Sequence, residues 1–149
     1  MTTLMNAILR LTISLWLGGV GLFTFVLTPL IFKNEDRDVA GRIVGYLFPG
    51  YFYWGLGCGV VALLALVAVR HQQRHLLVMA ALLLVMTATA MVQAWYIEPK
   101  AAALKREIPS FVTTPKDHPL RREFSRLHGI SAVCNLAVFA GGVALVVLL

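Results

Sequence analysis

The sequence predicts an all-α protein, an integral membrane four-helix bundle of antiparallel up-down topology. The 149-residue chain is 59% hydrophobic and only 13% charged, about half the charged share of a soluble domain. Its apolar residues form four long stretches, each reaching the roughly 20 residues that cross a hydrocarbon core. All seven acidic residues and ten of the thirteen Lys and Arg lie in two connecting segments. We therefore expect a single four-span membrane domain over residues 1–149.

The first span is expected over residues 8–32. Apolar side chains occupy all sides of this helix, as is typical of a helix surrounded by lipid rather than water. Pro29 lies near its end, where membrane helices tolerate a bend. No convincing cleavage site accompanies this stretch, so we expect it to be retained as an anchor.

The second span is expected over residues 43–69. Pro49 and Gly50 lie near its start, and a proline inside a helix removes one backbone hydrogen bond. We therefore expect a short interfacial helix, or a kinked start, before the crossing proper. Aromatic residues crowd this boundary as in the aromatic belts of membrane proteins. They are Tyr46, Phe48, Tyr51, Phe52, Tyr53 and Trp54.

The third and fourth spans are expected over residues 76–97 and 120–148. The connection before the third span is short, which makes the second and third helices antiparallel neighbours. Residues 98–119 form the main extramembrane segment, which several prolines interrupt. Pro119 suits the first turn of the last helix, because a proline there loses no intrahelical hydrogen bond.

The basic residues predict how the bundle is oriented. Three of them, Arg10, Arg70 and Arg74, belong to the face that holds both termini, whereas ten belong to the opposite face. The positive-inside rule then places both termini outside and the two charged connections in the cytoplasm, for a multi-pass protein of the cell membrane. The net charge of +6 is explained by this topology, so we expect no nucleic-acid partner.

A few polar residues inside the predicted spans are the candidates for function. No Asp, Glu or Lys lies in a span core, which argues against a carboxylate proton relay or a cation cage. Spacings of three and four residues place His128, Ser131 and Asn135 on one face of the last helix. Gln93 is expected at a similar depth on the third helix. These four residues form a candidate polar seam. Three roles are open for it: hydrogen bonds between helices, a ligand or metal ion bound at His128, or an interface.

Metal, cofactor and enzyme chemistry find little support in the sequence. Met79, Met86, Met91, Cys58 and Cys134 are soft ligand types that suit monovalent copper, but no close pair of ligands is present. No catalytic triad or paired carboxylates can be assembled inside the membrane, so we expect no enzyme and predict no cofactor.

Small residues predict close helix packing. Gly55 and Gly59 are four residues apart, and such pairs let helices approach closely within a monomer or between copies. A chain of 16.4 kDa that surrounds a transport path needs several copies, so we expect a homo-oligomer in the lipid bilayer.

Several segments resemble a known family. The Ser-Leu-Trp-Leu-Gly-Gly segment from residue 14, the Gly-Arg-Ile-Val-Gly segment from residue 41 and the Arg-Leu-His-Gly segment from residue 126 are similar to the transmembrane protein 205-like family. These are small four-helix membrane proteins, distantly similar to copper resistance protein D-like bundles. The resemblance implies no catalytic role. It places at motif positions Trp16, Arg42, Pro49, Pro99, Arg126, His128 and Asn135.

Three functions are compatible with these features. The leading hypothesis is a transport or tolerance component that handles a small solute or a soft metal ion through the polar seam. The alternative is a non-transporting scaffold or assembly factor whose basic cytoplasmic segment binds anionic lipid headgroups or a partner. The third is a haem or quinone binding module.

Overall fold

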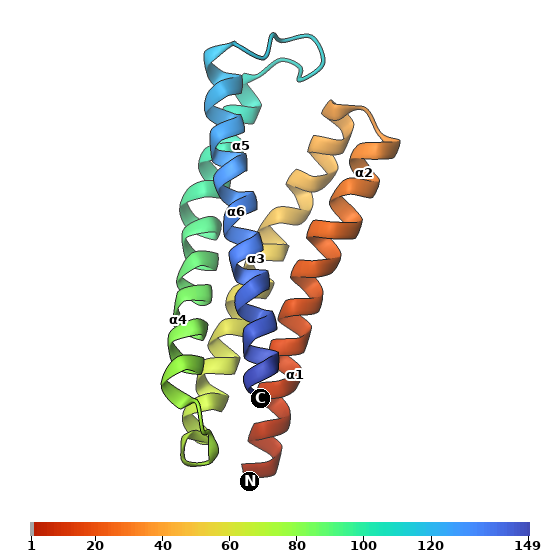
Figure 1. Ribbon diagram of the computed structural model, residues 1–149. Helices are drawn as coiled ribbons and strands as arrows, with labels where there is room; N and C mark the ends of the chain where they lie inside the picture. Colours follow the sequence, from red (N-terminus) through yellow and green to blue (C-terminus); the bar gives the residue numbers. More distant parts are fainter. Residues whose placement is uncertain (1) are drawn as a thin grey trace.

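Four long antiparallel helical rods make up the protein. The structure, a computed structural model, describes residues 2–149, and each rod runs the length of the molecule (Figure 1). All four are long and apolar enough to cross a membrane. The predicted all-α membrane four-helix bundle is therefore confirmed.

Two of the rods contain several helical segments in sequence. The first consists of α1 (Thr2–Gly21), the π-helical turn η1 (Leu22–Leu27) and α2 (Thr28–Asn34). The third consists of α4 (Leu76–Val92), the π-helical turn η3 (Gln93–Ile97) and α5 (Glu98–Glu107). The second and fourth rods are single helices, α3 (Arg37–Ala68) and α6 (Pro119–Leu148). A 3₁₀ turn, η2 (Arg70–Gln72), follows α3.

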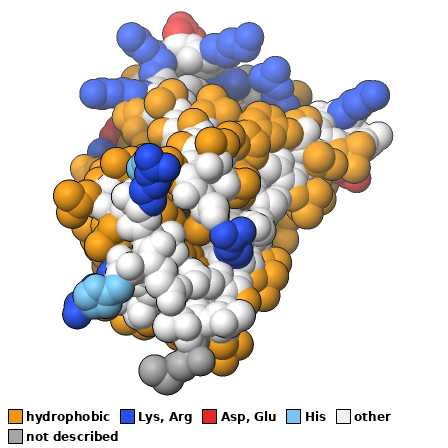
Figure 2. Space-filling view, turned by 60° about the horizontal axis from the view of Figure 1, so that its bottom comes forward, with side chains coloured by type: hydrophobic (Ala, Val, Ile, Leu, Met, Phe, Trp, Pro, Cys, Tyr) orange, Lys and Arg blue, Asp and Glu red, His pale blue; other side chains and the backbone are white. Residues whose placement is uncertain are grey.

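The two ends of the bundle differ in charge. Both termini and the turn between α3 and α4 lie at one end, which we call the terminal end (Figure 1). The connections at residues 35–36 and 108–118 lie at the other, the charged end. Seen toward the terminal end, hydrophobic side chains cover much of the flanks, and most of the visible Lys and Arg gather at the far end (Figure 2).

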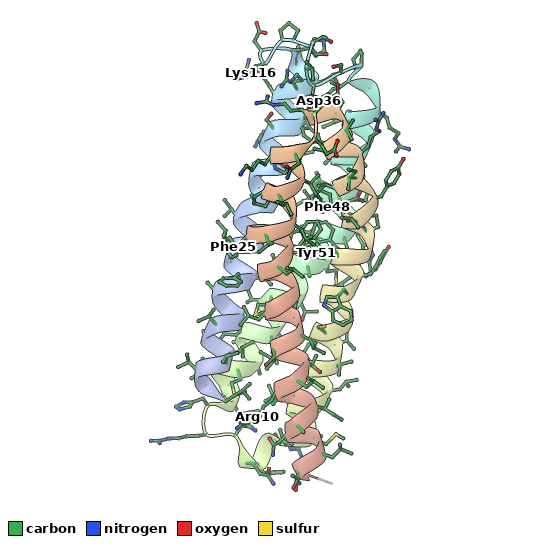
Figure 3. The ribbon with its side chains drawn as sticks, turned by 90° about the vertical axis from the view of Figure 1, so that its right-hand side faces the viewer. Arg10, Phe25, Asp36, Phe48, Tyr51 and Lys116 are labelled. Carbon is green, nitrogen blue, oxygen red and sulfur yellow. The ribbon has the colours of Figure 1, made fainter. Side chains whose placement is uncertain are left out.

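The second rod passes Pro49 without a break. A separate interfacial helix, which the sequence suggested before the second crossing, does not form, because α3 runs continuously from Arg37 to Ala68. Aromatic contacts lie on both sides of Pro49: Phe48 stacks on Phe52 with ring centroids 5.5 Å apart, and Phe48 and Tyr51 both contact Phe23 of η1, at 5.6 and 4.3 Å. Figure 3 shows Phe48 and Tyr51 pointing from α3 toward the bundle interior.

Glycines allow the helices to approach closely in the core. A Cβ atom at Gly55 would lie 3.0 Å from Nε1 of Trp16, and one at Gly59 would lie 2.4 Å from Oγ1 of Thr87. Trp16 is 2% exposed and belongs to the main hydrophobic cluster. Gly55 and Gly59 therefore serve packing between helices of the same chain, and a homo-oligomer stays a prediction.

The two π-helical turns each end two residues before a proline. The N–H groups of Thr28 and Glu98 donate to carbonyls five residues earlier, and Pro29 and Pro99 follow directly. A proline ring collides with the carbonyl four residues before it in a regular α-helix. A wider turn relieves this collision and adds one residue to the helix. The side chains beyond each turn are thereby rotated relative to those before it.

Candidate functional site

Three of the four predicted seam residues meet inside the bundle. The Ser131 hydroxyl donates to Oε1 of Gln93 over 2.8 Å, and Nε2 of Gln93 donates to Oδ1 of Asn135 over 3.3 Å. Gln93 is only 1% exposed, and the other two are also buried. These bonds join η3 to α6 and give each of the three side chains a partner, which a polar group in an apolar interior requires.

His128 lies outside this hydrogen-bonded group. Its ring is stacked parallel to that of Phe124, with centroids 6.1 Å apart, and it lines a different space nearer the charged end. Seven residues separate His128 from Asn135, which is about 10 Å along a helix axis. The seam thus comprises Gln93, Ser131 and Asn135.

The seam encloses almost no free volume. The cavity beside it measures about 10 Å³ and is lined by Gln93, Asn135, Trp16 and aromatic residues of α3. One water molecule needs at least about 10–15 Å³ of such volume. The observed arrangement therefore favours packing hydrogen bonds over a solute path at this point.

A much larger space lies at the charged end, between the α2–α3 pair and the α5–α6 pair. It has a volume of about 850 Å³ and combines cationic with aromatic side chains. We call it the basic cleft. Its cations are Arg37, Arg42, Lys105, Arg106 and Arg121; its aromatic rings are those of Phe32, Tyr46, Phe48, Phe111 and Phe124; Glu98 and His128 also line it.

Lys105 crosses the basic cleft from α5 to α3. Its ammonium donates to the carbonyl oxygen of Gly41. A Cβ atom at Gly45 would lie 3.1 Å from Nζ, and one at Gly41 would lie 3.4 Å from it. The two glycines, one helical turn apart, form a notch on α3 that leaves room for the amine.

Arg121 is the most deeply buried cation of the basic cleft, with 8% of its surface exposed. Its guanidinium donates to the carbonyl oxygen of Thr114 and lies 5.5 Å from the centre of the Phe111 ring. Both contacts attract a cation, the second through the ring quadrupole, but neither supplies a negative charge.

The cations of the basic cleft form no close ion pair with a described carboxylate, although Asp38 lies near Arg42 and Lys105, and Glu98 near Arg106. Within residues 2–149 the ion pair that the structure shows is the exposed one between Lys100 and Glu123, at 2.8 Å. Glu98 is the one acid among the residues that line the cleft, against five cations. A cation withdrawn from water without a counter-charge costs free energy. Arg121 and, in part, Lys105 bear this cost, whereas Arg37, Arg42 and Arg106 are exposed to water.

Asp38 organises one wall of the basic cleft. Its carboxylate accepts hydrogen bonds from the Ser110 hydroxyl and from the backbone N–H of Phe111, both 2.6 Å long. Asp38 precedes the apolar stretch of α3 and so lies outside the membrane-spanning segment. These two bonds, led by that from Ser110, hold the pKa of the Asp38 carboxyl below its usual value. They also fix Phe111 beneath the Arg121 guanidinium.

The remaining predicted positions are dispersed. Trp16 lies in the core and Arg42 lines the basic cleft. Pro49, Pro99 and Arg126 are exposed. Among the described residues no group of three or more His, Cys, Asp or Glu is placed to hold a metal ion.

Sequence reasoning treated the basic residues as a linear segment and missed how they converge. Arg37 and Arg42 come from one charged connection and Lys105, Arg106 and Arg121 from the other. The signal in the sequence was the pair Gly41 and Gly45. They lie four residues apart beside a charged connection, where two glycines leave room for a side chain from another helix.

Comparison with known families adds one finding. A family model described as a domain of unknown function, DUF4149, matches residues 11–110, which include α3, α4 and α5 and most of α1. No solved structure matches the chain.

Proposed function

This chain belongs to the DUF4149 family, a domain of unknown function, and we propose that it works by binding an anionic molecule in the basic cleft. It is a multi-pass membrane protein with four apolar helices. The proposal develops the scaffold hypothesis, in which basic residues at the cytoplasmic face hold anionic headgroups or a partner. In this proposal the charged end lies in the cytoplasm, and the ligand is bound without any covalent chemistry.

One observation carries the proposal. Arg121 is 92% withdrawn from solvent and its contacts are a backbone carbonyl and an aromatic ring. Lys105 reaches across the same cleft toward another carbonyl. A bound anion would supply the negative charge that both side chains lack, and charge-assisted hydrogen bonds to such groups are strong.

The other functions predicted from the sequence have less geometric support. Transport of a small solute or soft metal needs a path, and the seam is closed by its own hydrogen bonds. Four expectations from the sequence stay predictions: transport, haem or quinone binding, homo-oligomer formation, and membership of the transmembrane protein 205-like family.

Binding of inorganic phosphate to the purified full chain in neutral detergent tests the proposal. We expect millimolar phosphate to raise the melting temperature of the wild type. In the Lys105→Met and Arg121→Gln variants, the apparent affinity for phosphate, read from the same melting shifts, should be at least tenfold lower. Arg122→Gln and Lys116→Gln are matched controls, because both side chains are exposed and neither lines the basic cleft. Equal phosphate responses in all five proteins would contradict the proposal.

A further inference from the structure

The basic cleft has two chemically different halves along its length. On α3, the cations Arg37 and Arg42 come first, and Val44 and Phe48 follow deeper in the bundle. On α6, Arg121 precedes Phe124 in the same direction. Six residues from Arg42 to Phe48 cover about 9 Å of helix. On α5 the chain runs the other way, so Lys105 and Arg106 lie toward the aqueous end and Glu98 lies deeper, as does His128 on α6. The cleft therefore presents its cations toward the aqueous end, and its inner half is mainly apolar but includes Glu98 and His128.

Aromatic side chains border the basic cleft on its outer, exposed side. Tyr46 is 82% exposed and Phe32 is 44% exposed, although both border the basic cleft. Tyr46 and Phe32 come from α3 and α2, at the charged end where aromatic side chains sit at the membrane interface. A molecule could enter sideways from the bilayer and keep its apolar part out of water throughout.

The volume of the basic cleft also indicates a ligand larger than a free ion. About 850 Å³ lies near the upper end of the 300–1,000 Å³ typical of sites for small organic molecules. Inorganic phosphate would engage the cations and leave the rings of Phe48 and Phe124 facing water. An amphiphile would cover both halves at once.

Resting on the anion-binding function proposed above, we infer that the occupant of the basic cleft is an anionic phospholipid taken from the surrounding leaflet. Its phosphate lies among Lys105, Arg42 and Arg121, and its acyl chains lie along the half lined by Phe48 and Phe124. A phosphate group suits forked guanidinium donors, and basic residues at a membrane surface favour anionic lipids. Five cations line the cleft against Glu98, with Asp38 beside them on its wall, and this excess of positive charge suits an anionic headgroup better than a zwitterionic one.

Two variants separate the halves of the site. Lys105→Met removes a cation from the polar half. Ala102→Trp fills the apolar half from α5, where Ala102 lines the cleft, and leaves every cation in place. Leu47→Trp is the matched control for added bulk, because Leu47 is 42% exposed on α3 and does not line the basic cleft.

The experiment places the full chain in nanodiscs of phosphatidylcholine with a small fraction of phosphatidylglycerol, extracts it with mild detergent and counts retained lipids by native mass spectrometry. We expect the wild type and Leu47→Trp to retain phosphatidylglycerol over phosphatidylcholine at least tenfold beyond their ratio in the disc. Ala102→Trp should lose this enrichment and still respond to inorganic phosphate. Lys105→Met should lose both the enrichment and the phosphate response.

The outcomes distinguish this inference from the proposed function. A wild type that responds to phosphate but retains both lipids equally would overturn the phospholipid and leave anion binding intact. Preferential retention of oleate over phosphatidylglycerol, in discs that contain both, would also overturn it. Equal enrichment of phosphatidylglycerol in Ala102→Trp and Leu47→Trp would show that the apolar half of the cleft does not bind the lipid, and would contradict the inference. No response to phosphate and no lipid enrichment would end both proposals.

Discussion

Ser131 on α6 donates its hydroxyl proton to Gln93 on η3 over 2.8 Å, and this bond ties the third rod to the fourth inside the bundle. Replacing Gln93 by Leu would leave the hydroxyl of Ser131 and the amide of Asn135 without their partner. We expect the free energy of unfolding to fall by about 1–2 kcal/mol, measured by reversible unfolding in mixed detergent micelles. Thr89→Val is the control, since its exposed hydroxyl bonds only to the Val85 carbonyl of its own helix. A Gln93→Leu protein as stable as that control would contradict the role of the seam in packing.

Gly59 has no space for a side chain. A Cβ atom there would lie 2.4 Å from Oγ1 of Thr87 and 3.1 Å from two of its carbons. Gly59→Ala should therefore lower stability by about 1–3 kcal/mol, seen as a lower midpoint in the same unfolding assay. Gly57→Ala is the matched control, because nothing lies within 4 Å of its added Cβ. It should be neutral or stabilising by up to about 1 kcal/mol.

A second substitution tests the cause of the Gly59 effect. Thr87→Ala removes the hydroxyl and methyl groups that approach Gly59, so Gly59→Ala in that background should cost less than it does alone. Identical costs in both backgrounds would show that Thr87 is not the source of the strain.

Asp38 should anchor the connection at residues 108–118 as a carboxylate. Asp38→Ala removes the acceptor of the Ser110 and Phe111 hydrogen bonds, so amide exchange at Phe111 should become faster. The pKa of Asp38 is lowered in the folded protein, so its contribution to stability is present above the usual value of 3.8 and is lost as pH falls through the lower folded value. Asp36→Ala is the control, because Asp36 is exposed and its side chain caps no helix. Slow exchange at Phe111 in Asp38→Ala would contradict this anchoring role.

Lys105 should stabilise the bound protein and not the empty one. Its ammonium is half-buried without a carboxylate partner, so Lys105→Met removes a desolvation cost and loses one hydrogen bond to Gly41. We expect the melting temperature of delipidated, phosphate-free protein to be unchanged or higher in Lys105→Met. Lys100→Met, which breaks the exposed pair with Glu123, should cost at most about 1 kcal/mol. A marked loss of stability in empty Lys105→Met would show that the amine serves the fold itself.

Cysteine labelling tests the predicted orientation. Lys116 lies in the connection between α5 and α6, and His71 lies in the turn at the opposite end; both are exposed. A membrane-impermeant maleimide should label His71→Cys in intact cells and Lys116→Cys only after the membrane is opened. Native Cys58 and Cys134 lie within helical rods, buried and half-buried, and should stay unlabelled. The reverse labelling order would place the charged end outside.

The fold was predictable because lipid imposes a simple rule on sequence. Every backbone polar group must be satisfied inside the hydrocarbon, so long apolar stretches become helices and their count fixes the bundle. The meeting of Gln93 with Ser131 followed from antiparallel pairing alone. Pro49 suggested a separate interfacial helix or a kinked start, and only the separate helix is excluded, because α3 continues through Pro49 with Phe48 stacked on Phe52 across it.

The basic cleft was not predictable in the same way. It depends on Lys105 reaching Gly41, 64 residues away in sequence, and on Asp38 holding Phe111, 73 residues away. No periodicity in the chain encodes contacts of this range. His128 was assigned to the seam because helical spacing gives direction but not the identity of the neighbour at each depth.

The π-helical turn η3 stands between the polar seam and the basic cleft on the third rod. One residue in an α-helix corresponds to about 100° of rotation, so deletion of a single residue from the part of η3 after Gln93, residues 94–97, would turn α5 by that angle. Gln93 could keep its bonds to α6 while the Lys105 amine swung away from its notch on α3. The cleft thus depends on what amounts to a one-residue insertion, and relatives that lack it would share the bundle without sharing the pocket.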